Sequence, residues 1–116
     1  MALPGRYDMH AYKSTDFVKN LTFTEDDKGI DFANYSAKME VKEDYEKAAV
    51  LTLTDGNEIT LNYNGIKGAL RIEVSESTLD NVEVNRYIYD LHLTDGNGYT
   101  TSWLEGWWIL HNQVTD

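Results

Sequence analysis

The chain has 116 residues, no cysteine and a formal net charge of −10, with 41% hydrophobic and 26% charged residues. This length suits one globular domain with one core, and the lack of thiols excludes disulfides and cysteine-based metal or catalytic sites. The excess of acid disfavours nucleic acid or an anionic membrane surface as a partner, because both are bound through Lys and Arg, and no apolar run approaches the roughly 18 residues of a membrane span.

Apolar and polar side chains alternate with a period of two over most of the chain, which indicates β-strands. The alternating stretches are 7–11, 17–23, 35–41, 49–53, 59–63, 70–74, 87–93 and 99–110. They recur about every 8–12 residues, a spacing typical of an all-β sandwich or barrel. We therefore predict an antiparallel, immunoglobulin-like β-sandwich of seven to eight strands. Residues 1–12 form an N-terminal arm or first edge strand in this prediction, and 13–116 form a single sandwich domain.

Glycine-containing dipeptides separate several of these stretches and can supply the positive φ angles of tight turns. They are Asp55-Gly56, Asn64-Gly65 and Asp95-Gly96, and a further turn is expected at Asp26-Asp27-Lys28-Gly29. We expect one hairpin to join 47–54 to 58–63 and another to join 84–94 to 99–110. Between them, Ser75–Asn81 offers Ser and Thr as N-caps followed by an acid, so it predicts one helical turn that crosses from one sheet to the other.

The last stretch, Tyr99–Leu110, would span about 40 Å as a single strand, which exceeds a typical strand. Gly106 is therefore expected to mark a bend or a bulge. Trp107 and Trp108 are adjacent and must point to opposite faces. We expect one of them to lie in the core and the other to be exposed or covered by something else.

No motif of catalysis or metal binding stands out. His10, His92 and His111 are isolated in the sequence, and Asp26, Asp27 and Asp31 do not match the spacing of a calcium loop. No nucleophile motif is present, and Glu105 is the single carboxylate that an enzymatic hypothesis could use as acid or base. We expect no catalytic residue, no metal and no cofactor.

Aromatic residues make up 12% of the chain, and we expect most of them to lie in the core or in cross-strand pairs. Tyr and Trp are favoured at interfaces because each offers a large area and a polar tip. The candidate interface residues are Tyr63, Tyr99, Trp103, Trp107 and Trp108. An alternative use is a carbohydrate-binding or host-adhesion module, in which Tyr99 and the three tryptophans would stack on sugars.

Several segments together resemble a family of small virion proteins of tailed phages and prophages. The segments are Tyr12–Phe17, Asp26–Phe32, Tyr35–Val41, Leu51–Leu53, Leu70–Ser75 with Thr78-Leu79, Arg86–Leu93, Trp103–Gly106 and Val114-Thr115. The specific part is a combination: the Tyr87-Ile88-Tyr89-Asp90-Leu91 pattern, which is similar to the family's Tyr-x-Tyr-Asp-Leu strand, together with the later Leu104-Glu105-Gly106 and Val114-Thr115. The chain departs from the family at Trp107-Trp108, where small β-formers are usual, and at Asn81–Asn85, where a shorter turn is usual.

The resemblance implies an immunoglobulin-like sandwich and a non-enzymatic structural role. Members are associated with the neck, tail or baseplate, so the partners would be other virion proteins, several copies per particle, after synthesis in the host cytoplasm. It implies no catalytic residues, and it implies a structural role for Asp90, which would accept hydrogen bonds within its strand or a nearby turn. Nucleic acid and membrane are not expected as partners.

Overall fold

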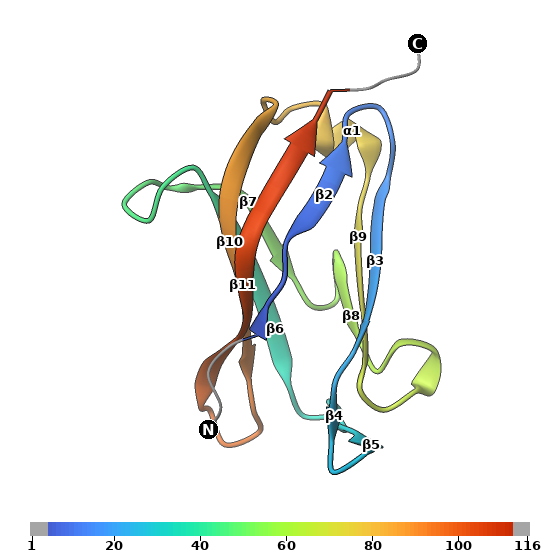
Figure 1. Cartoon of the computed structure of the whole chain (residues 1–116). Helices are drawn as coiled ribbons and strands as arrows, with labels where there is room; N and C mark the ends of the chain where they lie inside the picture. Colours follow the sequence, from blue (N-terminus) through green and yellow to red (C-terminus); the bar gives the residue numbers. More distant parts are fainter. Residues whose placement is uncertain (1–4, 113–116) are drawn as a thin grey trace.

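Two facing β-sheets and a separate two-stranded ribbon make up residues 5–112, the part of the chain that the computed structural model describes (Figure 1). Eight strands of three residues or more lie within this range, together with three strands of two residues. The strands are β1 (Gly5–Arg6), β2 (Met9–Tyr12), β3 (Phe17–Thr22), β4 (Thr24–Glu25), β5 (Lys28–Gly29), β6 (Ser36–Lys42), β7 (Ala49–Thr54), β8 (Ile59–Leu61), β9 (Ala69–Val74), β10 (Asn85–Thr94) and β11 (Thr100–His111). The predicted β-sandwich is confirmed.

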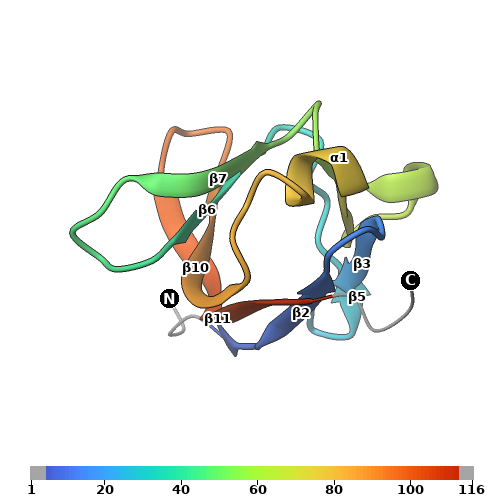
Figure 2. The same cartoon turned by 90° about the horizontal axis from the view of Figure 1, so that it is seen from above.

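The large sheet has the strand order β1-β11-β10-β6-β7. On the same edge, β1 pairs with the middle of β11 and β2 pairs with its C-terminal end. Both β1 and β2 run parallel to β11, whereas the other neighbours are antiparallel. The small sheet has the order β3-β9-β8. Seen from above, β7, β6 and β10 lie on one side of the molecule, β11 and β2 run along the lower edge, and β3 lies on the other side (Figure 2).

The core lies between the sheets because each strand turns alternate side chains inward. Met39, Val41, Leu91, Ile72 and Trp108 are among the fully buried side chains. Removing a large apolar side chain from water stabilises a fold by about 1.5–3 kcal/mol. The alternation of apolar and polar residues in the sequence therefore predicts which side of each strand faces the other sheet.

The short helix α1 (Glu76–Leu79) follows β9 and leads the chain from the small sheet to the large one. Its N-cap is Ser75, whose hydroxyl accepts a hydrogen bond from the Thr78 N–H, and Leu79 is buried beneath it. The predicted helical turn and its crossing are confirmed. At the start of β10 the Tyr87 hydroxyl donates to the Glu83 carbonyl at 2.7 Å, an arrangement that matches the tyrosine corner of immunoglobulin-like sandwiches.

Of the two predicted hairpins, one is confirmed and the other is wrong. β10 and β11 pair antiparallel over their whole length. β7 and β8 do not pair: β7 borders β6 in the large sheet, and β8 pairs with β9 in the small sheet. The Asp55 carboxylate accepts the Ala37 N–H at 2.8 Å, which ends β7 against β6 before the chain crosses to the other sheet. Alternation predicts which face of a strand is buried but not which strand lies beside it.

The positive φ angles of the predicted turns belong to different kinds of residue. Asp26 and Asp27 both have positive φ and form the two-residue turn between β4 and β5, as the hairpin rule requires. Gly56 also has positive φ, and so do Asn64 and Gly65 in the 3₁₀ turn η1 (Tyr63–Gly65). In the β10–β11 loop the positive φ belongs to Gly98 rather than to Gly96.

Gly106 serves a close approach rather than a bulge between β10 and β11. The register of that pair shifts between Leu91 and His92, which leaves Trp103 as the extra residue of β11. A Cβ atom at Gly106 would lie 2.5 Å from the Tyr7 carbonyl oxygen. The glycine thus lets the N-terminal segment lie directly against β11. No helix within residues 5–112 is long and apolar enough to cross a membrane.

Candidate docking face

The outer surface of the large sheet carries side chains that alternate with the buried ones. We call this surface the docking face. It is formed by Lys38, Glu40 and Lys42 on β6, by Ile88, Asp90 and His92 on β10, and by Glu105 and Trp107 on β11. The register aligns these residues in rows across the sheet, because Ile88 lies between Lys42 and Trp107 and Asp90 lies between Glu40 and Glu105.

A hollow of about 270 Å³ opens on this face. Ile88, Gly106 and Trp107 supply apolar and aromatic surface, Tyr89 lies beneath, and the exposed Tyr45 of the β6–β7 loop stands at the side. The Tyr89 hydroxyl donates to the Tyr7 carbonyl, and burial, reinforced by the nearby Asp8 carboxylate, raises the pKa of this phenol strongly. The Tyr89 side chain is buried on the inner side of the sheet, behind the strands that form the hollow, and its hydroxyl stays protonated at neutral pH.

Trp107 and Trp108 point to opposite faces, as expected. Trp108 is completely buried and packs against Phe17 and Tyr87, with ring centroids 6.0 and 6.3 Å away. It belongs to the core and cannot form part of an interface of the folded chain. Trp107 is partly exposed on the docking face, and the Arg86 guanidinium lies 4.3 Å from its ring centroid. One side of the indole is thus covered by a cation from the same chain.

Three carboxylates meet in one row of the docking face. Asp90 lies directly opposite Glu40 on one side and Glu105 on the other, and Glu105 lies opposite Arg6 of β1. Like charges opposite each other in a sheet are unfavourable. Asp90 also contacts the His92 imidazole at 2.9 Å. Glu105 is therefore an exposed member of a charged row and not an isolated acid.

Trp103, the third tryptophan, points into an aromatic cluster. Its ring contacts Phe23, Phe32 and Tyr35 in edge-on arrangements with centroids 5.5, 5.7 and 6.2 Å away. Such edge-to-face pairs stabilise a core beyond the area they bury. Trp103 closes this end of the sandwich instead of presenting an open ring.

The remaining interface candidates lie apart from Trp107. Tyr63, in η1, stacks with Arg71 at 4.8 Å. Tyr99 is 71% exposed in the β10–β11 loop, where the Asp95 carboxylate accepts its N–H at 3.1 Å. The structure does not bring Tyr99 and the three tryptophans together, so the sugar-stacking platform that they would form does not exist on this surface.

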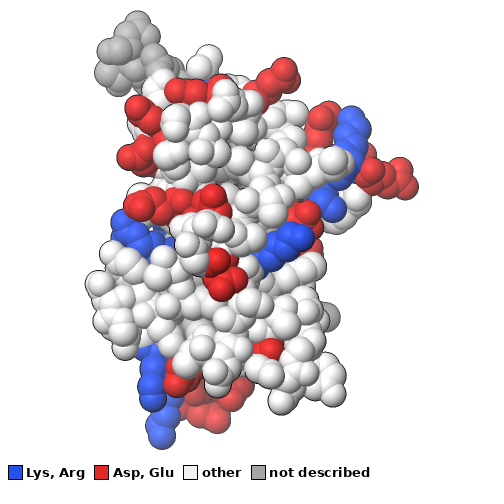
Figure 3. All heavy atoms as spheres, turned by 180° about the vertical axis from the view of Figure 1, so that it is seen from behind, with Lys and Arg blue, Asp and Glu red and all other residues white. Residues whose placement is uncertain are grey.

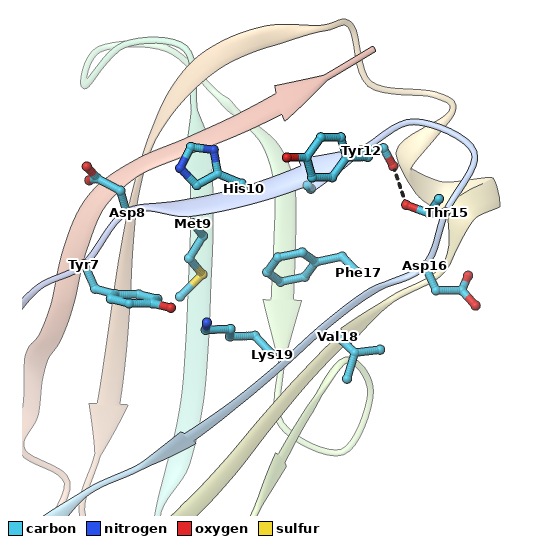
Figure 4. A pocket seen from close by; sticks show the side chains of 11 residues that line it. Tyr7, Asp8, Met9, His10, Tyr12, Thr15, Asp16, Phe17, Val18 and Lys19 are labelled. Carbon is cyan, nitrogen blue, oxygen red and sulfur yellow. Dashed lines mark hydrogen bonds between the residues drawn. The ribbon is translucent and has the colours of Figure 1, made fainter. Parts of the chain in front are cut away.

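A second cavity of about 290 Å³ lies where β2 of the large sheet and β3 of the small sheet diverge. Met9 of β2, Phe17 and Lys19 of β3, and Tyr7 of the segment before β2 point into this seam, whereas His10 and Tyr12 lie on the other side of β2 (Figure 4). The Lys19 ammonium lies 4.8 Å from the Tyr7 ring centroid. A charge that points inward at an edge strand discourages pairing with another strand.

Two histidines that are 101 residues apart in the sequence meet at the end of β11. His10 Nδ1 and His111 Nε2 are 2.8 Å apart, and the Tyr12 ring lies parallel to the His111 ring with centroids 4.8 Å apart. All three histidines are isolated in the sequence. Their spacing along the chain does not reveal that β2, near the N-terminus, lies parallel to β11, near the C-terminus. Within residues 5–112 no group of three or more His, Asp or Glu is arranged to hold a metal ion.

Charged side chains are dispersed over the surface. On the face opposite to that of Figure 1, Asp and Glu are scattered among uncharged residues, and Lys and Arg stand at separate points (Figure 3). In the loop beside β8, Asp31 accepts from the Asn62 side chain at 2.9 Å and from the Ala33 N–H at 3.0 Å. These bonds, led by that of Asn62, lower the pKa of Asp31. This carboxylate holds a loop together.

No family model and no curated protein matches the chain. Solved structures do match. A chain in the crystal structure of ICOS in complex with ICOS-L and an anti ICOS-L VNAR domain aligns with 94% of this chain and 55% of its own length, at 10% identity and a TM-score of 0.52. CopC from Methylosinus trichosporium OB3b aligns with 94% of this chain and 88% of its own, at 13% identity and a TM-score of 0.50. At such identities the similarity shows the fold alone, an immunoglobulin-like β-sandwich.

Proposed function

We propose that the chain is a non-enzymatic structural protein of a tailed-phage virion, a multi-copy connector or adaptor at the neck, tail or baseplate. It acts by protein–protein docking through the docking face. The phage assignment is supported by the sequence resemblance described above, of which one segment, Arg86–Leu93, lies within β10 at the centre of this face. The virion is the proposed location.

The observation that carries the docking role is the contrast between the outer surfaces of the two sheets. The small sheet exposes Val18 among the polar residues Asn20, Thr60 and Glu73, and its Arg71 is already engaged with Asn20 and Glu73. The large sheet instead carries a hollow beside Trp107 and Ile88. Interfaces concentrate their binding energy in Trp, Tyr and Arg residues near such hollows.

The proposed occupant is a large apolar or aromatic side chain from a neighbouring virion protein. The hollow would accept this side chain against Trp107, and the flanking row of Glu40, Asp90 and Glu105 would accept hydrogen bonds from donors around it. An apolar anchor surrounded by a polar rim is the usual anatomy of a protein interface. A structure with the same fold, that of ICOS with ICOS-L, is itself a protein complex.

The non-enzymatic part of the proposal rests on the polar groups around the hollow. Nucleophilic catalysis needs a hydroxyl or thiol beside a base. Within residues 5–112 the His92 imidazole contacts the Asp90 carboxylate at 2.9 Å, and no hydroxyl is hydrogen-bonded to it. Glu105 lies in the open charged row, where an acid or base would not be shielded from water.

Incorporation into particles tests both parts of the proposal, namely the role in the virion and the docking face as the binding surface. A phage lacking this gene would be complemented with the wild-type chain, with Trp107→Ala, or with Val18→Ser as a matched control on the outer surface of the small sheet. We expect the wild type and Val18→Ser to be found by mass spectrometry in purified virions, and Trp107→Ala to be strongly depleted although it folds.

The two failures are distinguishable. If the wild-type chain is absent from purified particles, the virion role is refuted. If the chain is present and Trp107→Ala is incorporated as well as the wild type, the virion role stands and the docking face is the wrong surface.

A further inference from the structure

The paired histidines at the end of β2 and β11 form a feature that the proposed docking does not use. His10 Nδ1 and His111 Nε2 face each other at 2.8 Å, and the two rings are inclined by only 16°. One ring donates its N–H and the other accepts, so each ring directs one nitrogen into the same small space. His10 is exposed and His111 is partly exposed.

The fold positions both rings from the backbone upward. β2 runs parallel to β11 with His10 opposite Ile109 and Tyr12 opposite His111, so the two histidines are diagonal neighbours on one face. Their inward neighbours, Met9, Ala11 and Leu110, are buried. Figure 4 shows His10 and Tyr12 on the outer side of β2, away from the seam. The strands are therefore anchored by the core beneath the pair.

We propose that His10 and His111 form a two-imidazole binding site for a divalent transition-metal ion of the Zn²⁺, Ni²⁺ or Cu²⁺ class. Imidazole nitrogen is a preferred ligand of these ions. Zn–N bonds of about 2.0–2.1 Å at a tetrahedral angle place two ligand nitrogens about 3.3 Å apart. The present separation of 2.8 Å needs to widen by only about 0.5 Å for this geometry, which small rotations of two solvent-facing rings can provide.

The proton balance of binding is simple. In the neutral pair, the N–H that lies between the rings must leave the space that the ion takes. The donor ring does this by changing tautomer, so that its proton moves through solvent to the nitrogen on the far side of the same ring. Both facing nitrogens then present lone pairs to the ion, and the pair neither gains nor loses a proton overall.

Neighbouring groups favour an ion with only two protein ligands. Asp8 lies two residues before His10, but its carboxylate already accepts the Trp107 N–H at 2.9 Å and faces Arg6 at 3.7 Å. The Tyr12 ring lies flat beside His111 and orients it. Water would fill the remaining positions of the ion. The two imidazole nitrogens do not suit Ca²⁺ or Mg²⁺, which prefer oxygen ligands.

The test uses the full chain without a histidine tag, titrated with ZnCl₂ and with NiCl₂ by calorimetry at neutral pH. The chain has three histidines, so His92→Ala is a matched control, because His92 pairs with Asp90 on the docking face. We expect His92→Ala to bind both ions as the wild type does. We expect His10→Ala and His111→Ala each to lower the affinity about tenfold or more.

A second measurement separates a metal ligand from a residue that merely holds β2 in place. His10→Gln keeps a hydrogen-bonding side chain opposite His111 but is a poor ligand, so it should fold with unchanged circular dichroism and still lose the ion. In long-range ¹H–¹⁵N spectra, Zn²⁺ should shift the facing nitrogens of His10 and His111 and leave His92 unchanged. Binding that His10→Gln retains, shifts centred on His92, or no binding by the wild type would each overturn the proposal.

Discussion

The two sides of the β10–β11 ladder use the same kinds of side chain in opposite ways. On the inner side Tyr87 and Tyr89 donate to backbone carbonyls, and Trp108 is packed between rings. On the outer side Trp107 contacts the Arg86 cation, and Ile88 lines an open hollow. The inner aromatics are fixed by partners from several segments, whereas the outer ones keep surface available. Adjacent residues of one strand can therefore serve stability and recognition separately.

The largest difference in stability is expected between Trp108→Ala, which truncates an inner ring, and Trp107→Ala, which truncates an outer ring of the same strand. Because Trp108 is fully buried, its truncation leaves a cavity and should cost about 3–5 kcal/mol in the free energy of unfolding. Truncation of Trp107 removes a partly exposed ring and one cation–π contact, which should cost about 1 kcal/mol or less. Urea denaturation of both variants measures the difference, and equal losses would show that the two sides are not distinct.

Gly106→Ala should have the next largest effect, because the new Cβ would lie 2.5 Å from the Tyr7 carbonyl oxygen and 2.8 Å from the Asp8 carboxylate. The N-terminal segment must then move off β11, at a cost of about 1–3 kcal/mol. Amide chemical shifts of residues 5–12 should change most. Unchanged shifts there, with unchanged stability, would contradict the close approach.

Tyr87→Phe removes the hydroxyl that donates to the Glu83 carbonyl at 2.7 Å. A single hydrogen bond of this kind contributes about 1 kcal/mol to stability. We expect a loss of that size by urea denaturation and faster amide hydrogen exchange in the segment between α1 and β10. Exchange that speeds up elsewhere and not in this segment would show that the tyrosine corner does not hold it.

The Tyr89 hydroxyl donates to the Tyr7 carbonyl, so Tyr89→Phe should cost about 1 kcal/mol at neutral pH, as Tyr87→Phe does, and a separate effect should appear in alkali. Burial, then the Asp8 carboxylate, raises the pKa of its phenol far above the ordinary value, which is about 10 in an unfolded chain. The stabilisation is therefore fully present below about pH 10 and declines as the pH rises above it, since the unfolded chain loses the proton first.

Alkaline denaturation curves of two variants test this linkage. Tyr89→Phe should flatten the fall in stability above about pH 10, whereas Tyr99→Phe, at a site 71% exposed, should leave it unchanged. An unchanged slope in Tyr89→Phe would place the alkaline transition in another group.

Alternation along the strands was enough to predict the sandwich and the opposed directions of Trp107 and Trp108. The N-cap residues predicted the helical turn at α1, and the Asp95-Gly96 turn signal predicted the β10–β11 hairpin. The same kind of signal at Asp55-Gly56 failed for β7 and β8, because an Asp-Gly turn fits both a hairpin and a crossing to the other sheet. Among the aromatic candidates, composition did not separate Trp108, which is fully buried, from rings that keep exposed surface, and only its packing partners place it inward.

The sequence by itself determined which side of each strand is buried, because a period of two is a local property that each strand carries independently. The tertiary structure alone decided which strands are neighbours, and with them the three carboxylates in one row and the meeting of His10 with His111. These arrangements join residues up to 101 positions apart. They depend on how whole sheets pack to bury their apolar faces, and no local pattern encodes that choice.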